Sequence, residues 1–131
     1  MHDTSFFRER QHFDYLIEHV LPLWRDQRQP RSIWSAGCAS GEEPYPLGMV
    51  LREHAPELDV RILATDLSLR VLSRAKQARY AEQVVQDVPS ALRAKYLRPV
   101  PGAGPKSYKV APDVTSMVSF ARLNLMGDWP M

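Results

Sequence analysis

The sequence lacks several features that would assign it quickly to a functional class. Its single cysteine, Cys38, excludes an intramolecular disulfide framework, and the absence of paired Cys and His spacings disfavours a zinc site. No apolar run approaches the roughly 20 residues that span a bilayer, so we expect no membrane insertion. The chain begins without a basic stretch followed by an apolar one, which disfavours a secretory leader. These absences together predict a protein of the reducing cytoplasm.

The charge balance excludes a further class. The formal net charge is only +2, and cations alternate with carboxylates along the first segment, as in Arg10 and Asp14. Such alternation is typical of solvated helix faces, so the sequence predicts no nucleic-acid partner. With 131 residues, of which 44% are hydrophobic, the chain can bury one core, as a small domain or as part of a larger protein.

The first segment, residues 1–24, has the pattern of an amphipathic helix. Apolar residues recur mostly at steps of three and four between Phe6 and Leu21. Pro22 follows, and we expect the helix to end there because proline disrupts a helix interior.

Residues 31–79 alternate between strand and helix patterns. Short apolar strands are predicted at 32–35 and 60–66, and each is followed by a helix, the first beginning near Pro44 and the second capped by Ser68. Strands that alternate with helices in this way indicate parallel βαβ units. The sequence therefore predicts an α/β fold with a parallel sheet.

The pattern changes in residues 80–117, where proline and glycine accumulate. A short helix at 91–96 and a β-ribbon through 108–110 are predicted there, which indicates a small inserted β-subdomain. Strand character returns in residues 118–131.

Two features mark a candidate ligand site. In open α/β sheets, ligands bind at the carboxyl ends of the strands, and the loop at 35–41 consists of small residues that let backbone approach a ligand. Asp66, at the end of the second strand, can accept hydrogen bonds from both ribose hydroxyls of an adenosine. The alternatives are a plain tight turn for the loop and a helix-capping role for Asp66.

Four motifs make a resemblance specific. They are TSFFR at 4–8, SAGCASGEEPY at 35–45, ILATDLS at 62–68 and the Asn124–Leu125 pair. In this order they resemble the CheR-type methyltransferases, which esterify glutamate side chains of bacterial chemoreceptors with S-adenosyl-L-methionine as cofactor. The resemblance implies a partial class I (Rossmann-like) methyltransferase sheet with a small inserted β-subdomain.

The resemblance also implies site residues. Cofactor contacts are implied for Thr4, Arg8, Ala36, Glu42, Asp66, Asn124 and Leu125. Arg8 is in addition a candidate for positioning the substrate carboxylate, and no metal is implied. A helix cap at Thr4, a solvated cation at Arg8 and a first-turn acid at Glu42 are the competing interpretations.

The chain departs from the family pattern at several points. His2 stands where the family usually has Asn, and Pro46 stands where it usually has Ser. The family's leading helical domain and its later F-C-R-N-V-x-I-Y-F-like segment have no counterpart among these residues. We therefore expect the chain to carry the cofactor half of the enzyme and to be inactive by itself.

The resemblance implies two partners: the cytoplasmic domain of a chemotaxis receptor, and the receptor's C-terminal peptide, which would dock on the inserted ribbon by strand addition. Two other functions stay open. One is a class I methyltransferase that acts on a small molecule, and the other is a non-catalytic remnant that binds cofactor or docks a protein.

Overall fold

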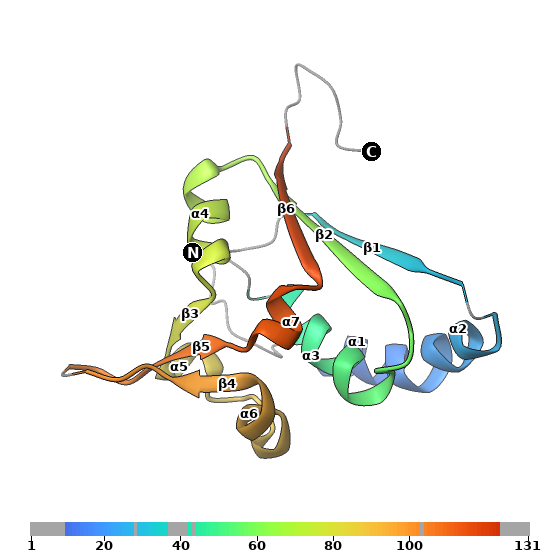
Figure 1. Cartoon of the computed structure of the whole chain (residues 1–131), viewed down its shortest axis with the longest axis horizontal. Coiled ribbons are helices and arrows are strands. Elements are labelled where there is room, and N and C mark those ends of the chain that lie inside the picture. Colours follow the sequence, from blue (N-terminus) through green and yellow to red (C-terminus); the bar gives the residue numbers. More distant parts are fainter. Residues whose placement is uncertain (1–9, 28, 37–41, 43, 103, 124–131) are drawn as a thin grey trace.

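The computed structural model describes residues 10–27, 29–36, 42, 44–102 and 104–123 of the chain (Figure 1). Its centre is a parallel sheet of β1 (Arg31–Ala36), β2 (Val60–Asp66) and β6 (Val118–Arg122) in the order β1-β2-β6. Ile62 of β2 pairs with Ile33 on one side and with Val118 on the other. The predicted parallel α/β arrangement is thus confirmed.

Two helices connect these strands. Helix α3 (Pro44–His54) follows β1, and helix α4 (Leu69–Gln77) follows β2. As predicted, Ser68 caps α4, since its Oγ accepts a hydrogen bond from the Val71 N–H at 3.2 Å. Pro46 lies inside α3 without breaking it, because N–H groups of a first helical turn have no intrahelical partner to lose.

The leading helix runs further than the sequence suggested. It comprises α1 (Arg10–Tyr15), a π-helical turn (Leu16–Val20) and α2 (Leu21–Gln27). The expectation that Pro22 ends the helix is therefore wrong. The Leu21 N–H bonds back to the Leu16 carbonyl, five residues earlier, so a π-helical turn directly precedes Pro22 and replaces the regular i→i−4 hydrogen bonds that a proline interrupts.

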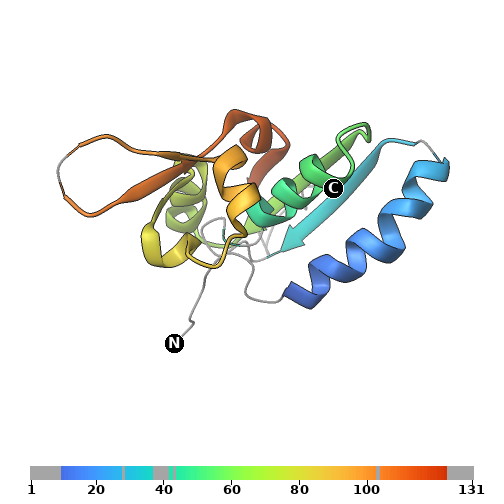
Figure 2. The same cartoon turned by 90° about the horizontal axis from the view of Figure 1, so that it is seen from below.

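The inserted segment forms a second, antiparallel sheet. Its strands are β3 (Arg79–Ala81), β5 (Ser107–Val110) and β4 (Leu97–Pro99), in the order β3-β5-β4. Three short helices accompany it: α5 (Glu82–Val85), α6 (Ser90–Tyr96) and α7 (Pro112–Thr115). The predicted helix and β-ribbon are confirmed. Figures 1 and 2 show the β4–β5 hairpin extending away from the large sheet.

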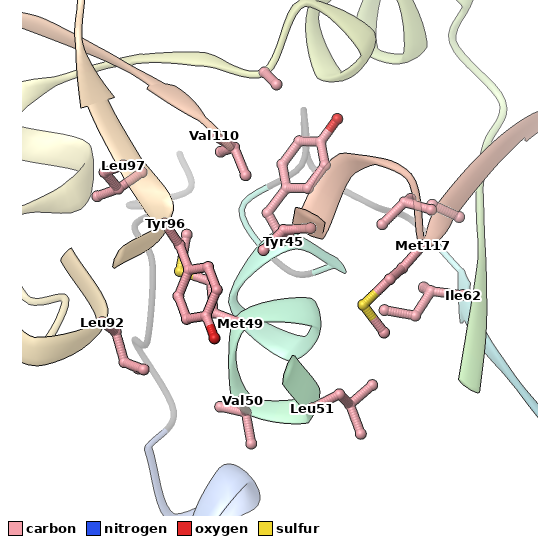
Figure 3. Close-up of a cluster of buried hydrophobic side chains, with 14 of the residues drawn as sticks. Tyr45, Met49, Val50, Leu51, Ile62, Leu92, Tyr96, Leu97, Val110 and Met117 are labelled. Atoms are coloured by element: carbon pink, nitrogen blue, oxygen red, sulfur yellow. The ribbon is translucent and has the colours of Figure 1, made fainter. Parts of the chain in front are cut away.

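Helix α3 packs at the centre of the hydrophobic core (Figure 3). Tyr45, Met49 and Leu51 on this helix are each at most 1% exposed. The large sheet contributes Ile62 to the same core, and the inserted subdomain contributes residues such as Val110. A single core thus joins both sheets through one helix.

The small sheet is tied to its helices by a polar cluster of Glu82, Arg93 and Tyr108. The Arg93 guanidinium pairs with Glu82 and lies 4.8 Å from the centre of the Tyr108 ring. The Tyr108 hydroxyl donates to Glu82 Oε1 at 2.9 Å. These hydrogen bonds, chiefly the one from Arg93, hold the pKa of Glu82 below its ordinary value of 4.5.

The contact between α3 and α7 leads to a first prediction. A β-carbon added at Gly48 would lie only 2.8 Å from Val114 Cγ1, and Val114 is fully buried and β-branched. We expect Gly48→Ala to lower the free energy of unfolding by about 1 kcal/mol, because overpacking outweighs the gain in helix propensity. Denaturant unfolding measures this.

The control for Gly48→Ala is a double-mutant cycle with Val114→Ala, which removes the clashing methyl group. The double variant should be less destabilised than the sum of the two single variants. A Gly48→Ala variant that is more stable than the parent would show that helix propensity dominates at this position.

The lowered pKa of Glu82 leads to a second prediction, on pH dependence. A carboxyl group with a depressed folded-state pKa adds stability above its unfolded pKa, and this stability is lost as the pH falls through the folded value. We therefore expect Glu82→Gln to lower Tm near neutral pH and the difference from the parent to vanish well below pH 4.5. Thermal unfolding across this range measures it. Two Tm curves that run parallel to acid pH would contradict the prediction.

Candidate functional site

The carboxyl ends of β1 and β2 meet at one edge of the large sheet. Ala36, the last residue of β1, is in register with Thr65, and Asp66 follows directly on β2. The two predicted site residues Ala36 and Asp66 are thus brought together. Gly37, the next residue of the small-residue loop at 35–41, lies outside the described residues.

Asp66 already has one structural task at this edge. Its Oδ1 accepts a hydrogen bond from the Ser68 N–H at 2.9 Å, which shapes the turn into α4. Among the described residues, its second carboxylate oxygen, Oδ2, accepts no hydrogen bond. The N-cap of α4 is Ser68, so Asp66 shapes the turn before the helix without capping it, and Oδ2 of this partly exposed side chain is left for a ligand donor. The ribose contact stays a prediction.

Arg122 fixes the same turn from the neighbouring strand. It is in register with Asp66, and its Nε donates to the Leu67 carbonyl at 3.1 Å. The Leu123 N–H donates to the Asp66 carbonyl at 3.0 Å. Sequence reasoning missed Arg122, although a lone cation at the end of a predicted strand could have drawn attention to it.

Thr65 holds the end of β2 in place. Its side chain is fully buried, and its Oγ1 accepts a hydrogen bond from the Trp34 indole Nε1 at 2.8 Å. This bond links β1 to β2 one residue before Asp66. Because Trp34 is itself 51% exposed, its indole bridges the two strands at the protein surface.

Tyr45 is a further residue whose role sequence reasoning missed. It is 1% exposed, and its hydroxyl donates to the Ala75 carbonyl of α4 at 2.5 Å. Its ring meets the rings of Tyr80 and Phe120 edge-on, each with centroids 6.1 Å apart. The start of α3 is thereby joined to α4, β6 and the small sheet. A large aromatic residue directly after Pro44 was the available signal.

The other predicted site residues divide into two groups. Glu42 is described, and it lies half-buried in a turn two residues before α3. The remaining four lie outside the described residues: Thr4, Arg8, Asn124 and Leu125.

The described residues also bear on metal binding and on membrane insertion. No group of three or more His, Cys, Asp or Glu side chains there could hold a metal ion. In the same part of the chain, no helix is both long enough and apolar enough to cross a membrane.

Comparison with known proteins gives one family. The family described as CheR methyltransferase, SAM binding domain, where SAM is S-adenosylmethionine, matches residues 2–131. The chain is 38% identical to a chemotaxis protein methyltransferase of Borreliella burgdorferi, with 95% of this chain and 46% of that protein covered. It is 35% identical to a probable chemotaxis protein methyltransferase of Rhizobium etli, with 97% and 50% covered.

A third relative, chemotaxis protein methyltransferase 2 of Pseudomonas aeruginosa, is 36% identical, with 96% of this chain and 46% of that protein covered. The chain thus spans about half the length of the curated relatives it matches. Because the family match covers nearly every residue, including the two strand ends that meet at Ala36 and Asp66, the chain belongs to the CheR methyltransferase family, as its SAM-binding domain.

Proposed function

We propose that the chain is the cofactor-binding part of a protein-glutamate O-methyltransferase that acts on chemotaxis receptors in the cytoplasm. The family match over residues 2–131 carries the proposal. The structure supports it with a parallel sheet whose strand ends bring Ala36 and Asp66 to one edge, the place where such sheets bind ligands.

The described residues fit the cofactor at its ribose. Asp66 Oδ2 can accept a hydrogen bond from one ribose hydroxyl, and a free lone pair of Oδ1 can accept from the other, while the bond from Ser68 is kept. Ala36 and Glu42 would contact the cofactor from the first loop. Thr4 and Arg8 would lie at its methionine end, and Asn124 and Leu125 would flank the adenine.

The chemistry needs little from the protein beyond position. When bound, the cofactor supplies a methyl group on a sulfonium, and the substrate glutamate, whose ordinary pKa lies well below 7, is ionised near neutral pH. No general base is therefore required. The chain's task is to hold the carboxylate in line with the methyl group and to exclude water.

Arg8 would orient the substrate carboxylate. A tight bidentate ion pair would make the attacking oxygen a poorer nucleophile, so the role of Arg8 is to position that oxygen or to contact the cofactor.

The small sheet would dock the C-terminal peptide of a receptor by strand addition. Of its two edge strands, β3 is the better candidate. On β4, the Val100 N–H donates to the Ser107 carbonyl of β5 at 2.9 Å, so the backbone groups of the preceding residue point to the open edge of the sheet. That residue is Pro99, which has no N–H to donate to an added strand. We therefore propose that the peptide pairs along β3.

Substitutions at Asp66 test the cofactor site. Asp66→Asn keeps an oxygen that can accept from Ser68 but replaces the other acceptor with a donor. We expect S-adenosylmethionine to bind about 10 to 100-fold more weakly, equivalent to about 1 to 3 kcal/mol, while Tm changes little. Isothermal titration calorimetry and thermal unfolding give the two values.

The matched control is Ser68→Ala, which removes the cap of α4. It should cost about 1 kcal/mol of stability and leave the cofactor affinity unchanged. If Asp66→Asn also leaves the affinity unchanged, Asp66 serves only the turn into α4 and the proposed ribose contact is wrong.

Methyl transfer is tested with the protein as the cell makes it. The protein is incubated with methyl-labelled S-adenosylmethionine and the cytoplasmic domain of a receptor. The expected product is a base-labile methyl ester on receptor glutamates, and Gln in place of those glutamates should abolish the labelling. Labelling of a small molecule in place of the receptor would overturn the proposed substrate.

A further inference from the structure

Charge is distributed unevenly along this chain. Residues 67–111, which include α4 and most of the inserted subdomain, contain nine Lys and Arg but only two Asp and Glu. The rest of the chain contains eight basic and thirteen acidic residues. The small net charge of the whole chain is thus the sum of a strongly basic segment and an acidic remainder.

The strand register concentrates part of this charge on one surface. Lys109 on the middle strand β5 pairs with Arg79 on β3 and with Arg98 on β4. All three side chains are exposed, and they form a row across the sheet that we call the basic row. Because neighbouring strands lie about 4.8 Å apart, the backbone positions of these three residues lie within about 10 Å of one another.

No described carboxylate neutralises the basic row. None of its three side chains forms an ion pair with a described residue, and Arg98 Nη1 donates instead to the Lys95 carbonyl at 2.7 Å. Glu82 instead pairs with Arg93 and Tyr108. Because Tyr108 precedes Lys109 on β5, its side chain lies on the opposite side of the sheet, and Glu82 is bound there.

The opposite face of the small sheet is already covered. Tyr80, Leu97 and Val110 lie there and are at most 6% exposed, and Tyr80 packs against Tyr45 of the core. The face with the basic row is therefore the outer one. Like charges directly opposite one another destabilise a sheet, so an acidic partner on this face would relieve an existing repulsion.

We propose that the basic row binds an acidic α-helix of a partner protein, which lies across the three strands. Along a helix, residues three and four apart share a face and are separated by about 4.5 to 6 Å, which matches the spacing of cations on neighbouring strands. Alternate residues of an extended segment are about 6.6 Å apart and match less well. If the proposed function holds, the partner is the glutamate-bearing receptor itself, and only this identification rests on that proposal.

The test uses synthetic helical peptides as probes. One carries three glutamates spaced three and four residues apart on one face, and a second has the same composition with the glutamates distributed around the helix. At low ionic strength we expect the one-sided peptide to bind more tightly to the 131-residue chain. The triple variant Arg79→Gln, Arg98→Gln, Lys109→Gln should bind it about tenfold more weakly, since each exposed ion pair contributes modestly.

A matched pair of single variants controls for net charge. Lys109→Gln should weaken peptide binding, whereas Arg61→Gln, which removes an exposed cation on β2 of the large sheet, should not. Neither substitution touches the cofactor site, so S-adenosylmethionine affinity should stay at the parental value and Tm should not fall, since Lys109→Gln also removes a repulsion between like charges on neighbouring strands. Their retention separates a failure of this inference from a failure of the proposed function.

Three outcomes would overturn the inference. Equal binding of the one-sided peptide to the parent and to the triple variant would show that the basic row is not the docking surface. Equal binding of both peptides to the parent would show that helical spacing is not recognised. Tighter binding of a short DNA duplex than of the one-sided peptide would assign the row to nucleic acid.

Discussion

Helix α3 packs against both sheets at once, and the rest of the structure depends on these two contacts. Its first turn contains Tyr45, which is buried between α4, β6 and the small sheet. One turn later, the missing side chain of Gly48 lets α7 approach closely enough for Val114 to fill the space. Since both contacts are made by one rigid helix, the small sheet cannot shift relative to the large sheet without breaking the shared core.

Much of this arrangement could be predicted from the sequence because local patterns decide it. The apolar run of β2 and the Ser68 cap of α4 depend on residues within a few positions of one another, and both are as expected. The same is true of the parallel pairing of β1 and β2, which follows from a helix between two strands.

What could not be predicted depends on contacts between distant residues. The π-helical turn before Pro22 is one example, since proline alone predicts the end of a helix. The three-residue strands β3 and β4 are another, because they are strands only through their pairing with β5. The role of Tyr45 depends on a hydrogen bond to a residue 30 positions away. At the candidate site, the sequence indicated Asp66 but not Arg122, whose contact with Leu67 spans 55 positions.

The structure also places the two proposed binding surfaces at a fixed separation. From the cofactor edge, α4 runs back to Ala75, whose carbonyl accepts from Tyr45, and the Tyr45 ring meets Tyr80 of β3. Tyr80 pairs with Tyr108, the neighbour of Lys109 in the basic row. These links form a continuous path through α4, the Tyr45–Tyr80 ring contact and the paired strands β3 and β5.

A rigid path of this kind would suit the proposed methyl transfer, whose main requirement is geometry. A partner held on the small sheet would present its acceptor group at a set distance from the methyl donor, and no conformational change in this chain would be needed to align them. The two proposed surfaces differ in chemistry: the acceptor oxygens of Asp66 suit hydroxyl donors, and the exposed cations on the small sheet suit carboxylates, so each surface would select a different ligand.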